Sequence, residues 1–380
     1  MKKPIQFVAV VVLIIFGALD SFGQFRLTLD DRFQIESIYS IEISDYNHLT
    51  EQFLGLVTES SGYEIVLLNS RGEIIRKKNI AGEGPGQIKG ALNGLGFSPE
   101  GGIWMMSVGV IFYFNMELDY LRQQKFSSNF QLYRYGSPKK IPFFWSDNLQ
   151  KNIVFATYSS GEGIFSMSQN VKAEYMLELF DTNKNQNYQL AAVSDRKTGE
   201  KIDNSMKVLY YPVYHLDPSK KIAYVTGTID NEITVIDLTT GAELRQIAIR
   251  HGEFKSLSHS RITLDELPSS GPYTLTAINT KLISLDGDLI ILDYIREISE
   301  GTFKSKRIRN QYYHHFQDPD YHRLIFFDHT KQLSSDIPFP KNGKLMIALP
   351  GNKLLFKIDN PEVEEDFIRY EVYKVVVPQR

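Results

Sequence analysis

The sequence predicts an all-β fold, a β-propeller of four-stranded antiparallel blades, and three observations support this fold class. Short runs rich in β-branched and aromatic residues recur along the chain, whereas helical periodicity is scarce. A unit of apolar strand, polar turn and second strand repeats, as expected for the outer hairpin of a blade. No Pro/Ser/Gly tract, low-complexity run or charge block divides the chain, so one continuous domain is expected over residues 24–380.

The first 23 residues are predicted to be a secretory signal peptide, 1–23. A lysine pair supplies a positive start, residues 7–19 form an almost unbroken apolar run, and Ser21 and Gly23 are small residues placed for cleavage after Gly23. The apolar run is shorter than the roughly 20 residues that cross a bilayer, which disfavours a membrane anchor. The mature chain is therefore expected to be periplasmic or secreted, with no integral membrane segment.

The chain has no cysteine, which excludes a lipid-modified cysteine, disulfides, thiolate metal ligands and a cysteine nucleophile. Loss of the signal peptide removes two lysines and one aspartate and changes the formal net charge from −3 to −4. A weakly acidic protein of this kind is not expected to bind nucleic acid or a strongly anionic surface. The sequence identifies neither a cofactor nor an oligomeric state.

Four copies of the predicted outer hairpin are clear, and each turn begins with an asparagine or an aspartate. The side chains of these residues hydrogen-bond to backbone amides in turns, and glycine inside a turn accepts a positive φ. The turn residues are Asn69, Asn115, Asp237 and Asp328, with Gly72 and Gly241 in two of the turns; the hairpins are 63–80, 110–126, 232–249 and 324–337, with a fainter copy at 163–179.

Further strands are predicted before several of these hairpins. Two intervals between hairpins exceed the roughly 40 to 50 residues of a blade, which indicates insertions at 181–206 and 250–272. Six blades are expected, and a seventh would be required if the segment 282–298 formed the core of a further blade. The predicted additional strands are 101–108, 151–159 and 220–228.

The two ends of the mature chain are predicted to share one blade. Three strands are expected near the C-terminus, at 344–349, 352–359 and 367–377, and the N-terminus offers a fourth at 25–29 or 33–38. Pairing of this N-terminal strand with the last segment would close the ring and remove exposed strand edges.

Residues 80–90, IAGEGPGQIKG, contain four glycines and a proline. A phosphate-binding loop would need Gly-Lys followed by Ser or Thr, and a dinucleotide fingerprint would need a G-x-G-x-x-G register that opens a helix. Neither is present, because the lysine precedes the last glycine and no helical pattern follows. The loop is expected to lead from the outer strand of one blade to the inner strand of the next, with Gly82, Gly84 and Gly86 at φ values closed to other residues.

The loop 82–86, Gly-Glu-Gly-Pro-Gly, is followed by a strand and a turn at 98–104, and it resembles the inter-blade loops of secreted six-bladed β-propellers of Bacteroidetes, relatives of the TolB-like and NHL-like propellers. The segment 312–327 resembles a late blade of one uncharacterised family in this group. The resemblance covers most of the mature chain and implies the propeller fold and a periplasmic or surface location, with no agreed activity. Many relatives have an acidic residue after the loop, whereas this chain has Gln87, so the resemblance implies no carboxylate role there.

Half of the chain's eight histidines lie within residues 312–329, which makes this stretch the candidate metal site. If a hairpin turned at Asp318 and Asp320, His315 and His322 would be paired with Cβ atoms about 5 Å apart, close enough to share a metal. The two aspartates are candidate ligand-binding residues beside this pair. The alternative interpretation is that the histidines are half-exposed strand residues packed beside tyrosines, because zinc needs at least three protein ligands and no third is identified.

An aromatic and basic stretch at 132–145, LYRYGSPKKIPFFW, is the candidate recognition loop. Its Tyr133, Arg134, Tyr135 and Trp145 could offer a stacking surface to sugars or peptides. The alternative interpretation is an ordinary connection between blades that enters a strand near its end.

No complete catalytic constellation can be assembled from the sequence, because the G-x-S-x-G elbow of hydrolases and the spacing of a calcium loop are both absent. The sequence therefore predicts a secreted or periplasmic β-propeller that acts as a binding or interaction module for a protein, peptide or glycan. The alternative is a hydrolase or lyase that depends on a metal or on carboxylates at the mouth of the channel.

Overall fold

The computed structural model describes most of the chain after residue 24, and the predicted signal peptide lies outside the described residues. The described residues are 25–59, 62–90, 92–99, 101–107, 109–125, 140, 143–146, 152–158, 175–181, 184, 186–196, 212–254, 275–360 and 365–377.

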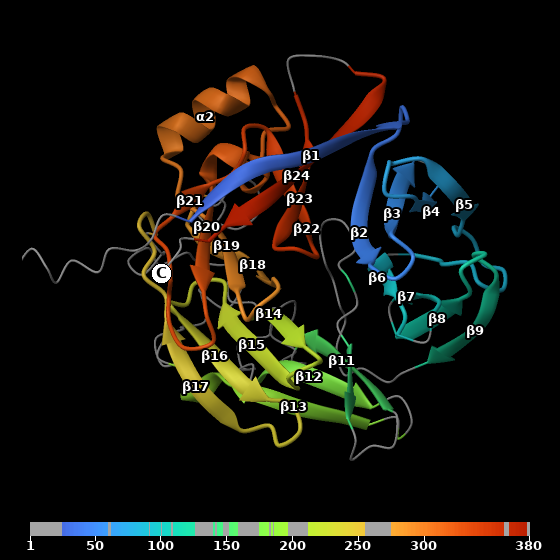
Figure 1. Ribbon diagram of the computed structural model, residues 1–380, viewed down its shortest axis with the longest axis horizontal. Helices are drawn as coiled ribbons and strands as arrows, with labels where there is room; N and C mark the ends of the chain where they lie inside the picture. Colours follow the sequence, from blue (N-terminus) through green and yellow to red (C-terminus); the bar gives the residue numbers. More distant parts are fainter. Residues whose placement is uncertain are drawn as a thin grey trace, which may run out of the picture.

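Within these residues, six four-stranded antiparallel sheets are arranged as the blades of a propeller (Figure 1). The all-β, six-bladed prediction is therefore confirmed. From the inner to the outer strand, blade 1 contains β2 (Ile41–Asn47), β3 (Gln52–Glu59), β4 (Gly62–Leu68) and β5 (Ile74–Asn79), and blade 2 contains β6 (Leu92–Phe97), β7 (Ile103–Ser107), β8 (Val110–Phe114) and β9 (Tyr120–Lys125).

The remaining blades follow in chain order. Blade 3 contains β10 (Phe143–Ser146), β11 (Asn152–Tyr158), β12 (Tyr175–Asp181) and β13 (Gln186–Ala192), and blade 4 contains β14 (Pro212–Asp217), β15 (Ile222–Gly227), β16 (Glu232–Asp237) and β17 (Glu243–Ala248). Blade 5 contains β18 (Ile278–Ser284), β19 (Ile290–Ile295), β20 (His322–Phe327) and β21 (Ile337–Pro338), and blade 6 contains β22 (Gly343–Leu349), β23 (Lys353–Ile358), β24 (Phe367–Val376) and β1 (Arg26–Glu36).

The four clear hairpins of the sequence are the outer strand pairs of blades 1, 2, 4 and 5. Their turns form as predicted, because the Asn69 side chain accepts hydrogen bonds from the backbone amides of Arg71 and Glu73. Asp237 does the same for Thr239 and Thr240. The predicted positive φ is present at both turn glycines, Gly72 and Gly241.

Three details of the predicted strand pattern are wrong. The segment 175–179, expected as the second strand of an outer hairpin, belongs to the third strand of blade 3 and is therefore the first strand of that hairpin; the rest of the faint copy lies outside the described residues. Residues 186–192, expected within an insertion, form the outer strand β13. The segment 282–298 supplies β19 and the last three residues of β18, which pair into the same blade as β20 and β21, so no seventh blade is needed.

Apolar clusters fill the seams between neighbouring blades, because the second and third strands of a blade are covered on both faces. In β7 and β19 every residue is buried. Blades 1 and 2 share one such cluster, and others join blades 3 to 4, 4 to 5, 5 to 6 and 6 to 1. Burial on both faces explains why these strands read as continuous apolar runs and not as an alternating pattern.

The two ends of the described chain meet in blade 6, where β1 lies beside β24 (Figure 1). Their antiparallel register runs from Arg26 opposite Val376 to Glu36 opposite Phe367, with a bulge near Leu29. The ring of Phe33 in β1 stacks on Tyr370 of β24 at 5.2 Å and on Phe53 of blade 1 at 5.3 Å. The single strand β1 thus replaces the two short N-terminal strands that the sequence left as alternatives.

The glycine loop connects β5 to β6, as predicted, and is built around two buried isoleucines. The amide of Ile88 donates to the carbonyl of Ile80 at 2.6 Å, and the amide of Gly82 donates to the carbonyl of Ile88 at 3.2 Å. The amide oxygen of Gln87 accepts from the Gly84 amide at 2.8 Å. Positive φ occurs at Gly82 and Gly86 but not at Gly84, so the expectation for Gly84 was wrong.

Replacement of Gly86 by alanine should destabilise the protein more than replacement of Gly90. Both glycines have positive φ, at +72° and +102°, but a Cβ on Gly86 would lie 2.7 Å from the Cβ of Tyr120, whereas Gly90 has no atom within 4 Å. We expect Gly86→Ala to lower the free energy of unfolding by about 2–4 kcal/mol, from backbone strain and overpacking together. Gly90→Ala should lower the free energy of unfolding by about 1 kcal/mol, from backbone strain alone. Equal losses in urea unfolding would contradict this assignment.

Removal of β1 should destabilise the whole propeller, because β24 would lose its outer partner and the blade 6 to blade 1 seam would lose Phe33 and Ile35. A chain that begins at residue 37 should lose about 5 kcal/mol or more of unfolding free energy, from two large apolar side chains and the strand ladder. The exposed edge of β24 should also promote association. Thermal unfolding and gel filtration test this against a chain that lacks only residues 378–380. A melting temperature within a degree or two of that of the control chain would refute this prediction.

Candidate binding surface

The connections between strands end on two opposite faces, because successive strands of a blade run in opposite directions. We call one the long-loop face, where inner strands begin and outer strands end, and the other the short-turn face. Among the described residues, the long-loop face carries connections such as 37–40, 80–90 and 296–321. The short-turn face carries connections such as 48–51, 69–73, 218–221, 238–242 and 350–352. Ligand-binding residues of a rigid scaffold are concentrated on such longer connections.

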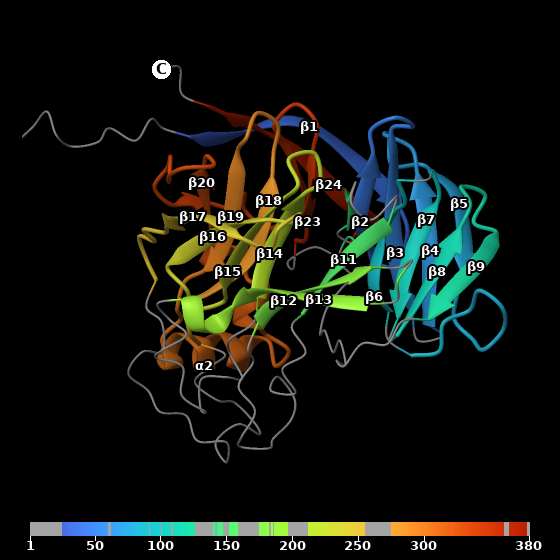
Figure 2. The ribbon, with the colours of Figure 1, turned by 90° about the horizontal axis from the view of Figure 1, so that it is seen from below.

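The described insertion on the long-loop face is residues 296–321, between β19 and β20, and it contains helix α2 (Glu300–Arg309). Figure 2 shows α2 beyond the ends of the strands. Ser299 caps its N-terminus by accepting a hydrogen bond from the Thr302 amide at 3.3 Å. An acidic residue lies in the first turn and three basic residues lie in the last, which suits the helix dipole. Only Phe303 of the helix is buried, so polar contacts contribute to holding α2 in place, such as that of Arg307 Nε with the Tyr313 carbonyl at 3.4 Å.

Asp318 is the main anchor of the insertion. Its Oδ2 accepts from Lys306 Nζ at 2.7 Å and from the Tyr313 hydroxyl at 2.8 Å. Burial acts to raise the pKa of Asp318, but these donors outweigh burial and hold the pKa below its ordinary value. Burial likewise acts to lower the pKa of Lys306, and its hydrogen bond to Asp318 raises it on balance. Both groups are therefore charged near neutral pH and tie α2 to the turn that follows it.

The predicted hairpin that pairs His315 with His322 is wrong. His315 lies in a 3-10 helix, and His322 is the first residue of β20, where its partner is Ile295 of β19. Asp318 caps a second 3-10 helix that begins at Pro319, so the chain does not form a two-stranded turn here. The expected hairpin does not form because β20 pairs with β19, and the insertion 296–321 separates these two strands in the sequence.

The two histidines contact different groups. His315 Nε2 lies 2.7 Å from the carbonyl oxygen of Arg296, and His322 Nδ1 lies 2.8 Å from Asp293 Oδ1. The Asp320 amide donates to Asp318, while the Asp320 side chain is exposed. In the described part of the chain, no group of three histidine, aspartate or glutamate side chains is placed to hold a metal. Ligand binding by these residues stays a prediction, and the contacts seen hold the insertion in place.

The candidate recognition loop is only partly described. Tyr133, Arg134 and Tyr135 lie outside the described residues, and Trp145 lies in the inner strand β10, opposite Ile153 of β11. The end of the stretch is thus a strand, as the alternative interpretation expected. Lys140 forms an ion pair with Asp45 of β2 at 2.8 Å.

A serine and a histidine that sequence reasoning missed face each other on the inner strands of blades 4 and 5. His215 Nε2 lies 2.7 Å from Ser284 Oγ. Burial lowers the pKa of His215 to about 4, so the imidazole is neutral near pH 7. The pair links two inner strands that are remote in sequence, and no local pattern signals it.

The insertion exposes apolar and basic side chains together, and we call this surface the insertion patch. Ile308 is 87% exposed and Tyr312 is 76% exposed, and Phe316 is also exposed. Around them lie Lys304, which pairs with Glu300, and Arg309. Residues 296–321 contain five basic and four acidic side chains and so carry a formal charge of +1, opposite in sign to the charge of the whole chain.

No protein-family model matches the sequence, and no curated protein matches it. Two solved structures are similar in fold. A member of the DUF4221 family from Bacteroides vulgatus has a TM-score of 0.59 at 10% identity, over 94% of this chain and 99% of that chain. A candidate exported protein from Bacteroides fragilis has a TM-score of 0.55 at 10% identity, over 95% of this chain and 97% of that chain. Identity at this level shows the fold alone, and both sources agree with the resemblance to Bacteroidetes propellers.

The described residues contain no helix that is long and apolar enough to span a membrane.

The ion pair between His322 and Asp293 should make stability depend on pH. Burial acts to lower the pKa of His322, and Lys281 acts in the same direction, but Asp293 outweighs both and raises the pKa. A pKa raised on folding contributes stability that is fully present below the unfolded value, about 6.5, and is lost as pH rises through the folded value. We expect His322→Gln to lower the free energy of unfolding by about 1–3 kcal/mol at pH 6 and by less at pH 8.

Urea unfolding of both proteins at the two pH values measures this difference. His329→Gln is the control, because His329 lies in the turn after β20 and not in this pair. A loss for His322→Gln that is the same at pH 6 and pH 8 would show that the charged imidazole contributes nothing.

Proposed function

We propose that the mature chain is a secreted or periplasmic binding module that docks a protein partner through the insertion patch. The observation that carries this proposal is the exposure of Ile308 and Tyr312 on a cationic insertion. Single exposed apolar residues are ordinary on protein surfaces. Here an isoleucine and two aromatic residues fall within one short segment, with arginine beside them, and Tyr, Phe and Arg are enriched where proteins bind one another.

The anchoring of the insertion supports the same proposal. Lys306, Tyr313 and Asp318 hold the helix and the following turn through the hydrogen bonds described above. A surface fixed in this way loses little conformational entropy when a partner binds. The isoleucine and the cationic groups favour a protein or peptide over a glycan, since sugars are bound mainly by aromatic faces and neutral or acidic polar groups.

Site-specific photo-cross-linking in the producing cells tests the proposal. A photoreactive phenylalanine analogue at position 308 should give a discrete protein adduct, identified by mass spectrometry. Position 49 is the matched control, because Leu49 is 82% exposed but lies on the short-turn face. Once the adduct is identified, Tyr312→Ala should weaken its binding at least tenfold, or about 1.4 kcal/mol. Absence of an adduct at 308, or the same adduct at both positions, would reject the proposal.

A further inference from the structure

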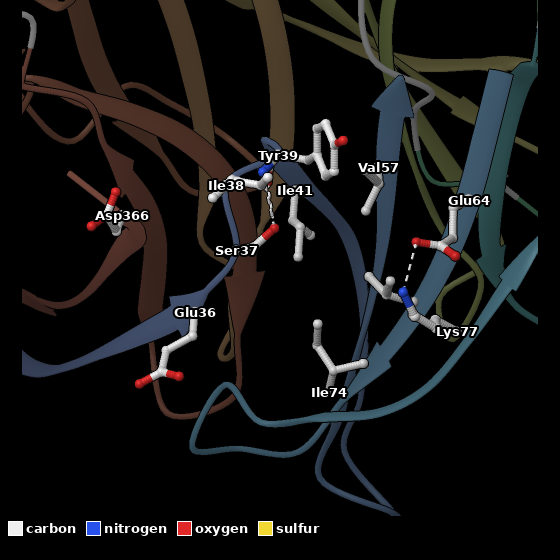
Figure 3. Close-up of a pocket in the computed structure, with 11 residues that line it drawn as sticks. Glu36, Ser37, Ile38, Tyr39, Ile41, Val57, Glu64, Ile74, Lys77 and Asp366 are labelled. Atoms are coloured by element: carbon white, nitrogen blue, oxygen red, sulfur yellow. Dashed lines mark hydrogen bonds and ion pairs between the residues drawn. The ribbon is translucent and has the colours of Figure 1, made fainter. Parts of the chain in front are cut away.

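A cavity of about 390 Å³ lies in the seam between blade 6 and blade 1 (Figure 3). Its floor is apolar and consists of Ile41, Val57 and Val66, all buried residues of blade 1. Figure 3 shows Glu36 and Asp366 on the blade 6 side. Pockets that hold ligands have this kind of apolar lining with a few polar groups, and a volume from roughly 300 Å³ upward.

The cavity exists because the connection from β1 to β2 crosses the seam. Residues 37–40 lead from the outermost strand of blade 6 to the innermost strand of blade 1. They fold on themselves locally, since Ser37 Oγ donates to the Tyr39 carbonyl at 2.8 Å and accepts from the Tyr39 amide at 3.2 Å. Ile38 is left 80% exposed at the cavity, so the connection borders the apolar floor without covering it.

The charge around the cavity is negative and incompletely neutralised. Glu64 pairs with Lys77 at 3.7 Å on the blade 1 side. On the blade 6 side, Glu36 and Asp366 have no cationic partner among the residues that the structure describes. The neighbouring Glu365, by contrast, pairs with Arg369 at 2.8 Å. Three carboxylates therefore face the cavity with one lysine, and two of the carboxylates remain available to a cation.

We propose that this seam cavity binds a lysine or arginine side chain of a peptide segment. Such a side chain has an aliphatic stem that fits an apolar floor and a cationic head that stays beside polar groups. The head would lie at Glu36 and Asp366, the stem over Val57 and an adjacent apolar residue of the peptide against Ile38. Charge-assisted hydrogen bonds from guanidinium or ammonium to carboxylate are among the stronger ones in proteins. This site is separate from the insertion patch and does not depend on it.

Calorimetry with the mature chain tests the site, with the acetylated and amidated tripeptide Leu-Arg-Leu as the probe. Leu-citrulline-Leu keeps the shape but removes the charge, and it should bind at least tenfold more weakly. Leu-Glu-Leu should not bind. Spermidine supplies cations without a peptide, and binding as tight as that of Leu-Arg-Leu would overturn the assignment to a peptide. Raising the salt concentration from 50 to 500 mM should weaken the binding of the arginine peptide, because salt screens the attraction between the opposite charges.

Single-carboxylate variants locate the site. Glu36→Gln and Asp366→Asn should each lower the affinity for Leu-Arg-Leu at least fivefold. Glu51→Gln is the control, because it removes the same charge from an exposed residue on the short-turn face. Equal binding by all three variants would overturn the proposal, as would no detectable binding of the arginine peptide by the wild type at 10 mM. Thermal unfolding of each variant confirms that the fold is intact.

Discussion

The structure depends on one constraint, which is that both faces of the middle strands of a blade are apolar and must be covered by neighbouring blades. A sheet with a single buried face could stand at the end of a stack, but β7 and β19 have no polar face to present to water. Each blade therefore needs a neighbour on both sides. This requirement explains why β1 joins the C-terminal blade, since its Phe33 contacts aromatic rings of blade 6 and blade 1 at once.

Polar links between neighbouring blades accompany this apolar packing. Lys281 of blade 5 donates to the Leu345 and Met346 carbonyls of blade 6. Glu42 of blade 1 accepts from Lys344 and Lys357 of blade 6. Burial lowers the pKa of Lys281, as expected for an amine removed from water. An unpaired charge is costly when it is buried, and Lys357 is buried, so its pairing with Glu42 favours one register between blades 6 and 1.

Local patterns in the sequence were sufficient to predict the fold class, and they failed where pairing depends on distant partners. The side chain of Asn69 and the glycine at 72 determine their turn locally, which is why the outer hairpins were predicted correctly. The pairing of His322 depends on Ile295, and the intervening helix has a mostly polar sequence that gives no strong helical period.

The seam cavity was beyond prediction for a related reason. Its two available carboxylates, Glu36 and Asp366, come from opposite ends of the chain. Only the pairing of β1 with β24 brings them together. The residues singled out from sequence in the insertion, such as Asp318, are instead seen as its anchors. The stretch 312–329 that the sequence singled out thus overlaps the end of the insertion, but the pairing predicted for His315 and His322 was wrong.

Both candidate surfaces follow from the topology of the propeller. Strands β19 and β20 pair antiparallel whatever the length of the chain between them, and the entropy cost of a longer connection grows only slowly. The length of the 296–321 insertion can therefore change without disturbing the apolar seams between blade 5 and its two neighbours. The connection 37–40 has no such freedom, because it must pass from an outermost to an innermost strand across a seam. The first surface projects from the fold and the second is recessed into it, and neither requires a change in the apolar packing that holds the blades together.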